Sequence, residues 1–186
     1  MKTKKVISII AVAVCMQFAV AQKPNSKFGG VQIGVITYSY RSMPDQTIEG
    51  MLNYTVQSGI NSIELMGGAV EQYAGIPEEK EAVRLWRTTV SMDKFKQVKD
   101  MFSEKGVTIH ILKLGNHRWS DEEIDYAFNV CKTLGAKGIS MEISEDAAKR
   151  MSPFAEKHGL YVIFHNHGQP GNPDFSFDRI LASALD

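Results

Sequence analysis

Two histidines stand on either side of an asparagine at the end of an apolar segment, where residues 160–168 read LYVIFHNHG. Neutral imidazoles bind metal ions, and histidine also transfers protons near neutral pH. Residues two apart on a β-strand point to the same side, so we expect His165 and His167 to face one site and Asn166 to point the other way. The alternative is a pair of structural histidines that backbone groups and packing satisfy.

Three other ionisable residues also fall late in apolar segments, namely Glu64, His110 and Glu142. Glu64 lies between two apolar residues, and an inward-facing carboxylate needs a cation or hydrogen-bond donors nearby, which favours a functional role. His110 is expected to face the same side as Leu112, so a core position and a site position fit it equally well. Glu142 precedes acidic residues that suit a helix start, so it is either a metal ligand or part of that start.

A polar segment follows His110 and contains Lys113, His117, Arg118 and Trp119. If this segment forms a loop over the site, these side chains can hold a phosphate or the hydroxyls of a sugar. The alternative is that they are ordinary solvated loop residues.

The elements that must position these residues are marked by glycines. Four glycines each follow an amphipathic segment and precede a short apolar one: Gly59, Gly106, Gly135 and Gly159. Glycine just past a helix readily adopts the left-handed conformation that closes the last turn, so each predicts a helix-to-strand junction. The predicted strands are 30–38, 62–66, 107–112, 137–143 and 161–165. The predicted helices are about 46–58, 77–87, 92–105, 120–134 and 145–158, with a last one after residue 176.

Two further signals refine these helices. Ser120 and Glu123 have the spacing of a capping box at the start of helix 120–134. Pro153 lies inside helix 145–158 and is expected to kink or split it, because proline lacks the backbone N–H that the helix needs.

Continuously apolar strands that alternate with helices predict a parallel sheet covered by helices. The carboxyl ends of parallel strands share one edge, so the carboxylates and imidazoles should converge there and suit a divalent ion such as Mn, Mg, Co or Zn. A closed (β/α)8 barrel needs about 250 residues, whereas this chain has about five and a half βα units. We therefore expect a partial barrel whose open strand edges favour homo-oligomers.

The amino terminus has the pattern of a secretory signal peptide: basic MKTKK, an apolar segment over 6–14, and small residues up to Ala21. We expect residues 1–21 to be removed, 22–28 to form a flexible lead and 29–186 to form one domain, exported to the periplasm or secreted. The apolar run is shorter than the roughly 20 residues of a membrane span, so no stable span is expected after cleavage. Cys131 would then be the only cysteine, which excludes an internal disulfide.

The charge balance limits the partners of the protein. Lys plus Arg and Asp plus Glu number 21 each, without a long run of one sign. A nucleic acid or an anionic membrane is therefore disfavoured as a partner. The segment after His167, GQPGNP, is too rich in proline to open a helix as a dinucleotide-binding motif would.

Several segments together resemble the sugar phosphate isomerase/epimerase family of xylose-isomerase-like TIM barrels. They are GVQIGVITYSY, GINSIELMG, WRTTVSMDKFKQVKDMFSEKGV and, above all, YVIFHNHG followed by FSFDRILA. The resemblance extends from Val31 to Asp186 and implies an α/β fold, a TIM (β/α)8 barrel of which only about the first five βα units are present. It also implies a divalent metal at the barrel mouth and a reaction that moves a proton between adjacent carbons of a ketose or related sugar.

The resemblance places His165 and His167 at the metal or proton-transfer position, with Glu64 and Glu142 supporting. Together with the residue patterns, it gives three groups of expected site residues: catalytic Glu64, His110 and His165, metal-binding Glu142 and His167, and sugar-binding Lys113, His117, Trp119 and Asn166. Many members carry a glutamate in place of His165, and the family's remaining metal ligands come from later strands that this chain lacks. Export favours a small-molecule sugar without phosphate, or a keto-glycoside that a lyase splits after the same enolisation. Outside the enzymes, the alternative is a non-catalytic carbohydrate-binding or remnant protein.

Overall fold

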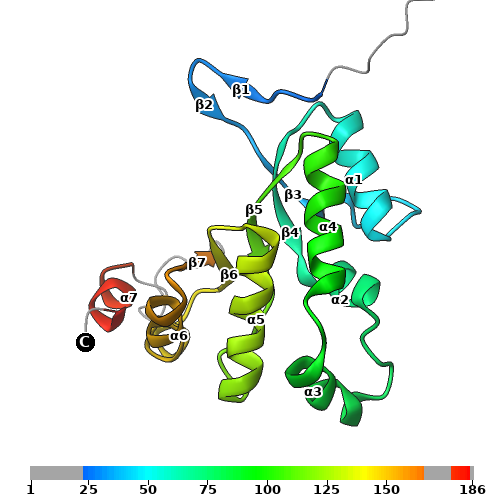
Figure 1. The fold of residues 1–186 in the computed structure, drawn as a ribbon. Coiled ribbons are helices and arrows are strands. Elements are labelled where there is room, and N and C mark those ends of the chain that lie inside the picture. Colours follow the sequence, from blue (N-terminus) through cyan, green and yellow to red (C-terminus); the bar gives the residue numbers. More distant parts are fainter. Residues whose placement is uncertain (1–22, 166–176, 185–186) are drawn as a thin grey trace, which may run out of the picture.

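The fold is seen in a computed structural model that describes residues 23–165 and 177–184. Its centre is a five-stranded sheet in the order β3-β4-β5-β6-β7 (Figure 1). All neighbouring strands are parallel, as the sequence predicted. The expected signal peptide and the candidates Asn166 and His167 lie outside the described residues.

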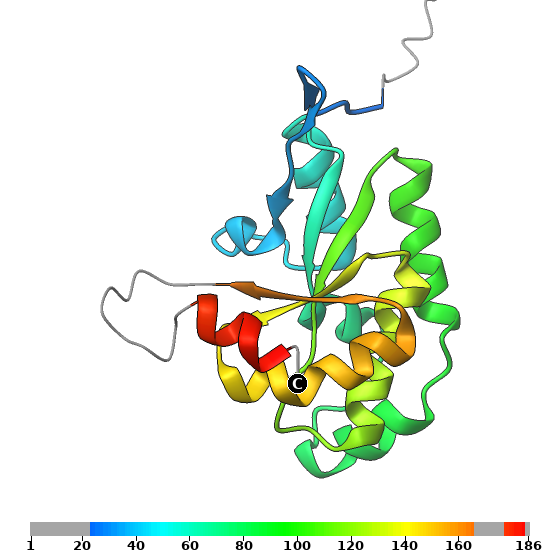
Figure 2. The ribbon, with the colours of Figure 1, turned by 90° about the vertical axis from the view of Figure 1, so that its left-hand side faces the viewer.

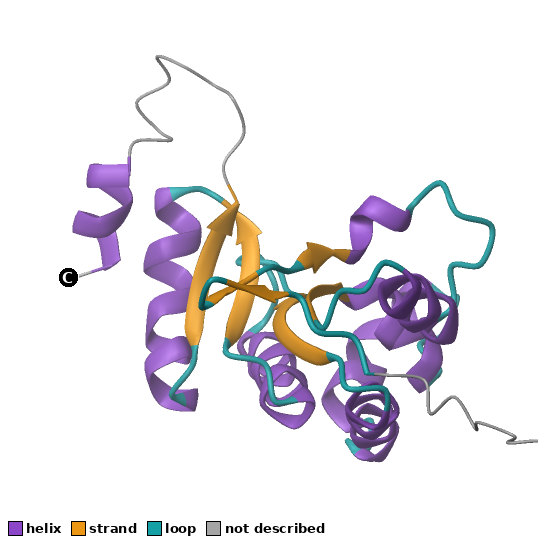
Figure 3. Cartoon of the chain, turned by 90° about the horizontal axis from the view of Figure 1, so that it is seen from above, coloured by secondary structure: helices purple, strands orange, loops and turns teal. Residues whose placement is uncertain are grey.

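The strands of this sheet are β3 (Val35–Ile36), β4 (Ser62–Met66), β5 (Thr108–Lys113), β6 (Gly138–Glu142) and β7 (Tyr161–His165). The helices are η1 (Thr37–Tyr40), α1 (Ile48–Gln57), α2 (Gly67–Ala74), α3 (Lys80–Thr89), α4 (Asp93–Glu104), α5 (Asp121–Leu134), α6 (Glu145–His158) and α7 (Phe177–Ala184). Figure 3 shows the helices along an arc outside the strands. This alternation of parallel strands with covering helices is the expected α/β architecture.

One hydrophobic core fills the space between the sheet and the helices. The strands contribute Ile63, Leu65, Ile109, Leu112, Ile139 and Met141, and the helices contribute large side chains such as Phe95, Phe102, Ile124 and Phe128. Successive side chains of a strand point to opposite faces of the sheet. In β6, Ile139 and Met141 point toward the helices, so Ser140 and Glu142 point away from them. We call this second side of the sheet the inner face, and it carries the candidate site.

The predicted helix-to-strand junctions are confirmed. Gly59, Gly106, Gly135 and Gly159 all have positive φ angles, between 66° and 78°. The capping box at the start of α5 is also present, with Ser120 and Glu123 exchanging hydrogen bonds. At each junction the chain passes from a helix on the outside back into the sheet. Strands that are consecutive in the chain are therefore neighbours in the sheet.

The prediction for strand one was wrong in part. Residues 27–36 form a hairpin of β1 (Lys27–Phe28) and β2 (Val31–Gln32) followed by the short β3. The buried Ser26, within the expected flexible lead, donates from its hydroxyl to Asn61 Oδ1 over 2.7 Å and fixes the hairpin base. In Figure 2 the hairpin projects beyond the end of the sheet (dark blue). A hydrogen bond between side chains 35 residues apart in the chain outweighed the apolar pattern here.

Two helix predictions also needed correction. Residues 67–74, expected as part of a long connection, form α2 directly after β4. Pro153 does not split α6, which is continuous from Glu145 to His158. The N-cap of α1 is Thr47, and the Asp45 carboxylate accepts hydrogen bonds from the Thr47 backbone N–H and hydroxyl.

Helix α6 is fastened to α5 by a polar contact on the outer side. Lys157 Nζ and His158 Nε2 lie 2.7 Å and 2.8 Å from the carboxylate of Asp125, and the His158 ring stacks on Phe128. Burial by itself would raise the pKa of Asp125, but hydrogen bonds from Lys157 and His158 lower it overall. His158 therefore belongs to the contact between α5 and α6.

The next features are the position of α7 and the two edges of the sheet. Helix α7 packs on α6, with Ile180 against Ile143 and Ala148, and Arg179 pairs with Glu145. Among the described strands, β3 and β7 each have one neighbour in the sheet. Within residues 23–165 and 177–184, no helix is both long and apolar enough to cross a membrane.

Candidate active site

Three predicted site residues lie together at the carboxyl ends of β5, β6 and β7. Lys113 Nζ lies 2.8 Å from Glu142 Oε1. Glu142 and His165 are register partners on adjacent strands, so their side chains stand side by side on the inner face. The three residues line a hollow of about 310 Å³ together with Ile36, Tyr38 and Met66. The sequence analysis expected Glu142 and His165 at this edge, whereas Lys113, expected on the following loop, is the last residue of β5.

Glu142 also lines a second hollow, of about 370 Å³, beside the loop between β5 and α5. Asn116 and His117 from that loop form one wall, and Ile143 with Ser144 from the start of α6 forms another. Glu142 therefore lies between the strand residues and the loop residues. With 58% of its side chain exposed it is open to a ligand, whereas Lys113 is 23% exposed.

Glu64 and His110 lie in a different hollow of the inner face. This hollow, of about 370 Å³, is bounded by residues of β3, β4 and β5 and by Gln32 of the hairpin. Glu64 is half-buried, and its Oε1 accepts a hydrogen bond of 2.6 Å from the Ser140 hydroxyl. Ile36 lines both this hollow and the one at the carboxyl ends. The three expected catalytic residues are thus divided between two adjacent hollows.

A β-bulge explains the position of His110. The register between β4 and β5 passes from Ile63 paired with Ile109 to Glu64 paired with Ile111, so His110 is an extra residue on β5. A bulge reverses the alternation of side chains, so the exposed His110 and the buried Leu112 do not share a face. The prediction that they would was wrong, because strict alternation assumes an unbroken ladder.

Trp119 lies apart from these hollows. The guanidinium carbon of Arg87, from α3, sits 3.8 Å from the centre of the Trp119 ring, and the ring packs against the core. Such a contact between a cation and an aromatic face contributes about 0.5–2 kcal/mol. The ring expected to contact a sugar is therefore occupied by a contact within the protein.

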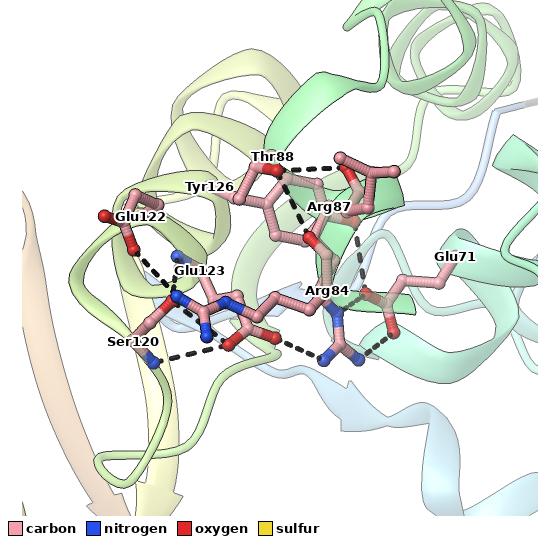
Figure 4. Close-up of polar contacts among 9 residues, drawn as sticks. Glu71, Arg84, Arg87, Thr88, Ser120, Glu122, Glu123 and Tyr126 are labelled. Atoms are coloured by element: carbon pink, nitrogen blue, oxygen red, sulfur yellow. Dashed lines mark hydrogen bonds and ion pairs between the residues drawn. The ribbon is translucent and has the colours of Figure 1, made fainter. Parts of the chain in front are cut away.

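Arg87 is the centre of a polar network that joins α2, α3 and α5 (Figure 4). Its guanidinium contacts both oxygens of Glu71 at 2.8 Å and 3.2 Å and reaches Glu123 Oε1 at 3.3 Å. The Tyr126 hydroxyl donates to Glu71 Oε1 over 3.2 Å. All three ion-paired side chains are largely buried, with 7 to 13% exposed; Glu71 and Glu123 therefore depend on Arg87 for compensation of their charge.

The pKa values of this network follow from burial and charge. Burial would lower the pKa of Arg87, but the hydrogen bonds and charges of Glu71 and Glu123 raise it overall. Burial, aided by the negative charge of Glu71, raises the pKa of Tyr126 well above its usual value. Arg87 is thus permanently charged and Tyr126 is a permanent hydrogen-bond donor. The sequence analysis did not identify either residue, because the segments that meet here lie far apart in the chain.

Two side chains with atoms that can bind a metal ion stand next to each other among the described residues. Glu142 and His165 offer an oxygen and an imidazole side by side, which suits a divalent ion. Within the two described ranges, no group of three or more Asp, Glu, His or Cys side chains is close enough to hold an ion. His167, which was expected to bind the metal together with Glu142, lies outside them. The donors present fit a metal, while Lys113 already contacts one of the Glu142 oxygens.

Comparison with known proteins supports the fold. No protein-family model matches the chain, and no curated protein matches it either. The solved structures to which the chain is similar include the following three. They are a probable 3-DHS dehydratase from Bacillus anthracis (TM-score 0.57, 13% identity), a xylose isomerase domain protein from Alicyclobacillus acidocaldarius (0.53, 14%) and a deoxyribose phosphate aldolase from Aeropyrum pernix (0.51, 14%).

The similarity extends over most of this chain but over only part of each solved structure. The matches cover 84%, 83% and 83% of this chain but only 60%, 60% and 61% of the dehydratase, the xylose isomerase domain protein and the aldolase. The chain thus spans about three fifths of the length of the structures that it matches. It has an α/β fold with a five-stranded parallel sheet, and this fold is similar to that of the xylose isomerase domain protein.

Proposed function

We propose that this protein is a sugar-processing enzyme that moves a proton between adjacent carbons of a ketose or a related sugar. The observation that carries the proposal is the grouping of Lys113, Glu142 and His165 around one hollow at the carboxyl ends of three parallel strands. This is where enzymes with barrel folds place their reactive groups. The names of the similar structures, an isomerase domain protein and an aldolase among them, support the same general chemistry.

The side chains of the hollow have complementary roles in this proposal. His165 moves the proton, because an imidazole can both accept and donate it near neutral pH. The Lys113 ammonium binds the sugar oxygen on which negative charge develops when a carbon-bound proton leaves. Tyr38 and Met66 offer apolar surface to the C–H face of the sugar. Glu64 and His110, in the adjacent hollow, remain predicted catalytic residues.

Glu142 and His167 would hold the expected divalent metal. A bound ion would act as a Lewis acid on neighbouring carbonyl and hydroxyl oxygens of the sugar. Lys113 contacts Glu142 Oε1, so metal and ammonium compete for that carboxylate. Removing the ammonium, in Lys113→Met, should therefore tighten binding of Mn²⁺ measured by calorimetry, and Glu142→Gln should weaken it.

The charges of the hollow favour a sugar without a phosphate group. Among the described residues that line the hollow, Lys113 is the only lysine or arginine, and it is already paired with Glu142. Phosphate recognition uses clusters of arginine or several backbone N–H groups. The expected export of the protein points to the same substrate class, because phosphorylated sugars are scarce outside the cytoplasm. We therefore propose a neutral ketose or keto-glycoside as the substrate.

Exchange of carbon-bound hydrogen for deuterium tests this function directly. The chain is incubated in D₂O with single monosaccharides and with or without Mn²⁺, and proton NMR follows the signals next to the carbonyl carbon. We expect the signal of one sugar to decline, and His165→Gln to abolish the exchange. Glu104→Gln, which alters an exposed carboxylate of α4, is the control and should exchange like the unmodified protein.

The products distinguish the alternatives. An isomerase or epimerase yields a second sugar of the same mass, whereas a lyase acting on a keto-glycoside releases a free aglycone after the same proton removal. A protein that binds a sugar without any exchange would be a carbohydrate-binding protein. If a folded preparation exchanges deuterium into none of the sugars or glycosides, the proposed reaction is refuted.

A further inference from the structure

We infer that Arg87 is a positioning residue for the candidate site, because it holds the loop between β5 and α5 through Trp119. We call residues 115–120 the site wall, since Asn116 and His117 in this loop line the hollow beside Glu142. The inference rests on the proposed function only in treating that hollow as part of the active site.

Two carboxylates orient the Arg87 side chain independently of its contact with Trp119. Glu71 from α2 binds its Nε and Nη2 groups, and Glu123 from α5 binds Nη1 (Figure 4). Two carboxylates on two different helices leave the guanidinium plane a single arrangement, because its five N–H groups have fixed directions. The plane then faces the Trp119 ring, with 3.8 Å between the guanidinium carbon and the ring centre.

The wall is also held at its backbone. The Trp119 N–H donates to the Asn116 carbonyl over 3.0 Å, and the Arg118 N–H donates to the Asn116 side chain over 2.9 Å. Arg150 from α6 donates to the Trp119 carbonyl over 3.4 Å. Trp119 is thus fixed by its ring from one helix and by its carbonyl from another. These contacts of Trp119 also fix the position of the turn that carries Asn116 and His117.

Stability alone gives a weak reason for such an arrangement. Burying an arginine with two carboxylates costs desolvation free energy, and well-packed apolar residues often stabilise a fold as much. The network does, however, define one position for the aromatic ring and therefore for the wall. A defined wall is what a binding hollow requires, because displacement by about 1 Å can cost a hundredfold in rate.

Hydrogen exchange of the wall amides tests this inference without any substrate. Two variants remove the contact in different ways: Trp119→Leu deletes the ring, and Arg87→Lys keeps a cation for Glu71 but loses the flat fork. Exchange of the Arg118 amide is measured by NMR in both. We expect it to accelerate about tenfold, since the lost contact between cation and ring fixes the turn.

Arg84→Ala is the matched control. Arg84 lies one turn before Arg87 on α3 and makes only an exposed contact of 3.7 Å with Glu122. Its exchange pattern should equal that of the unmodified protein. Unchanged exchange at Arg118 in both test variants would overturn the inference. An equal acceleration across α4, β5 and the wall would also overturn it, because it would indicate a general loss of stability.

A kinetic readout separates positioning from structural support. With a sugar found in the deuterium assay, Arg87→Lys and Trp119→Leu should raise the KM about tenfold and change kcat little, because the wall binds the sugar and does not move the proton. Equal KM values in these variants and in Arg84→Ala would contradict the inference. Absence of exchange with every sugar would refute the proposed function, while the amide exchange would still decide the role of Arg87.

Discussion

Two adjacent glycines at the start of α2 should respond to the same substitution in opposite ways. Gly67 packs closely on β5, and a Cβ atom added there would lie 2.8 Å from Leu114 Cβ and 2.9 Å from the Lys113 carbonyl oxygen. A Cβ added at Gly68 would meet no atom within 4 Å. Neither glycine has a positive φ angle, so strain of the backbone does not distinguish them.

The expected magnitudes follow from these contacts. Alanine in a helix is favoured over glycine by up to about 1 kcal/mol, so Gly68→Ala should be neutral or stabilising by this amount. The same gain applies at Gly67, but the overpacking against β5 costs about 1–3 kcal/mol. Gly67→Ala should therefore be about 1–3 kcal/mol less stable than Gly68→Ala. Its displacement of β5 should also disturb the position of Lys113.

Urea unfolding followed by circular dichroism measures this difference. With a slope of about 1–3 kcal/mol per molar urea, the two midpoints should differ by roughly 1 M. Equal midpoints for Gly67→Ala and Gly68→Ala would refute the reasoning. They would mean that α2 does not press on β5 as the structure indicates.

Three further predictions concern the fold around the site. Arg87→Met should lower the free energy of unfolding by about 3–5 kcal/mol in urea titrations, because two buried carboxylates lose their partner. Arg84→Met removes an exposed pair and should change this free energy by less than about 1 kcal/mol. Equal effects of the two substitutions would contradict the network. Asp125→Asn should cost about 1 kcal/mol at pH 6. The lowered pKa of Asp125 means that its stabilisation is present above the unfolded pKa of about 3.9 and is lost as the pH falls through the folded value. The difference between the two unfolding free energies should thus shrink as the pH falls below about 3.9, and a constant difference would argue against this ion pair. Burial raises the pKa of Cys131 to about 12, so iodoacetamide should label it, in peptide-resolved mass spectrometry, only when urea unfolds the chain; rapid labelling of the folded protein would contradict its burial.

Much of the sheet could be predicted because its signals are local. A glycine past each helix, a capping box at Ser120 and apolar segments of strand length each depend on neighbouring residues. These signals gave β4 and β7 their observed bounds. They failed at residues 27–36, where contacts of Ser26 with Asn61, 35 residues away, decide the conformation.

The candidate site was predictable in outline for a similar reason. Parallel strands present their carboxyl ends at one edge, so late polar residues such as Lys113, Glu142 and His165 had to meet there. The bulge at His110 was not predictable, because it arises from the register between β4 and β5. One extra residue turned His110 toward the hollow that it shares with Glu64.

The role of Arg87 and Trp119 was decided by tertiary structure alone. Glu71, Arg87 and Glu123 lie on three helices, and no spacing in the sequence connects them. By itself, the sequence determined where helices and strands alternate and which polar residues end the strands, because these properties follow from local conformational preference. The tertiary structure decided which of those residues share a hollow, and which are held away from it, because that depends on strand register and on contacts between distant helices.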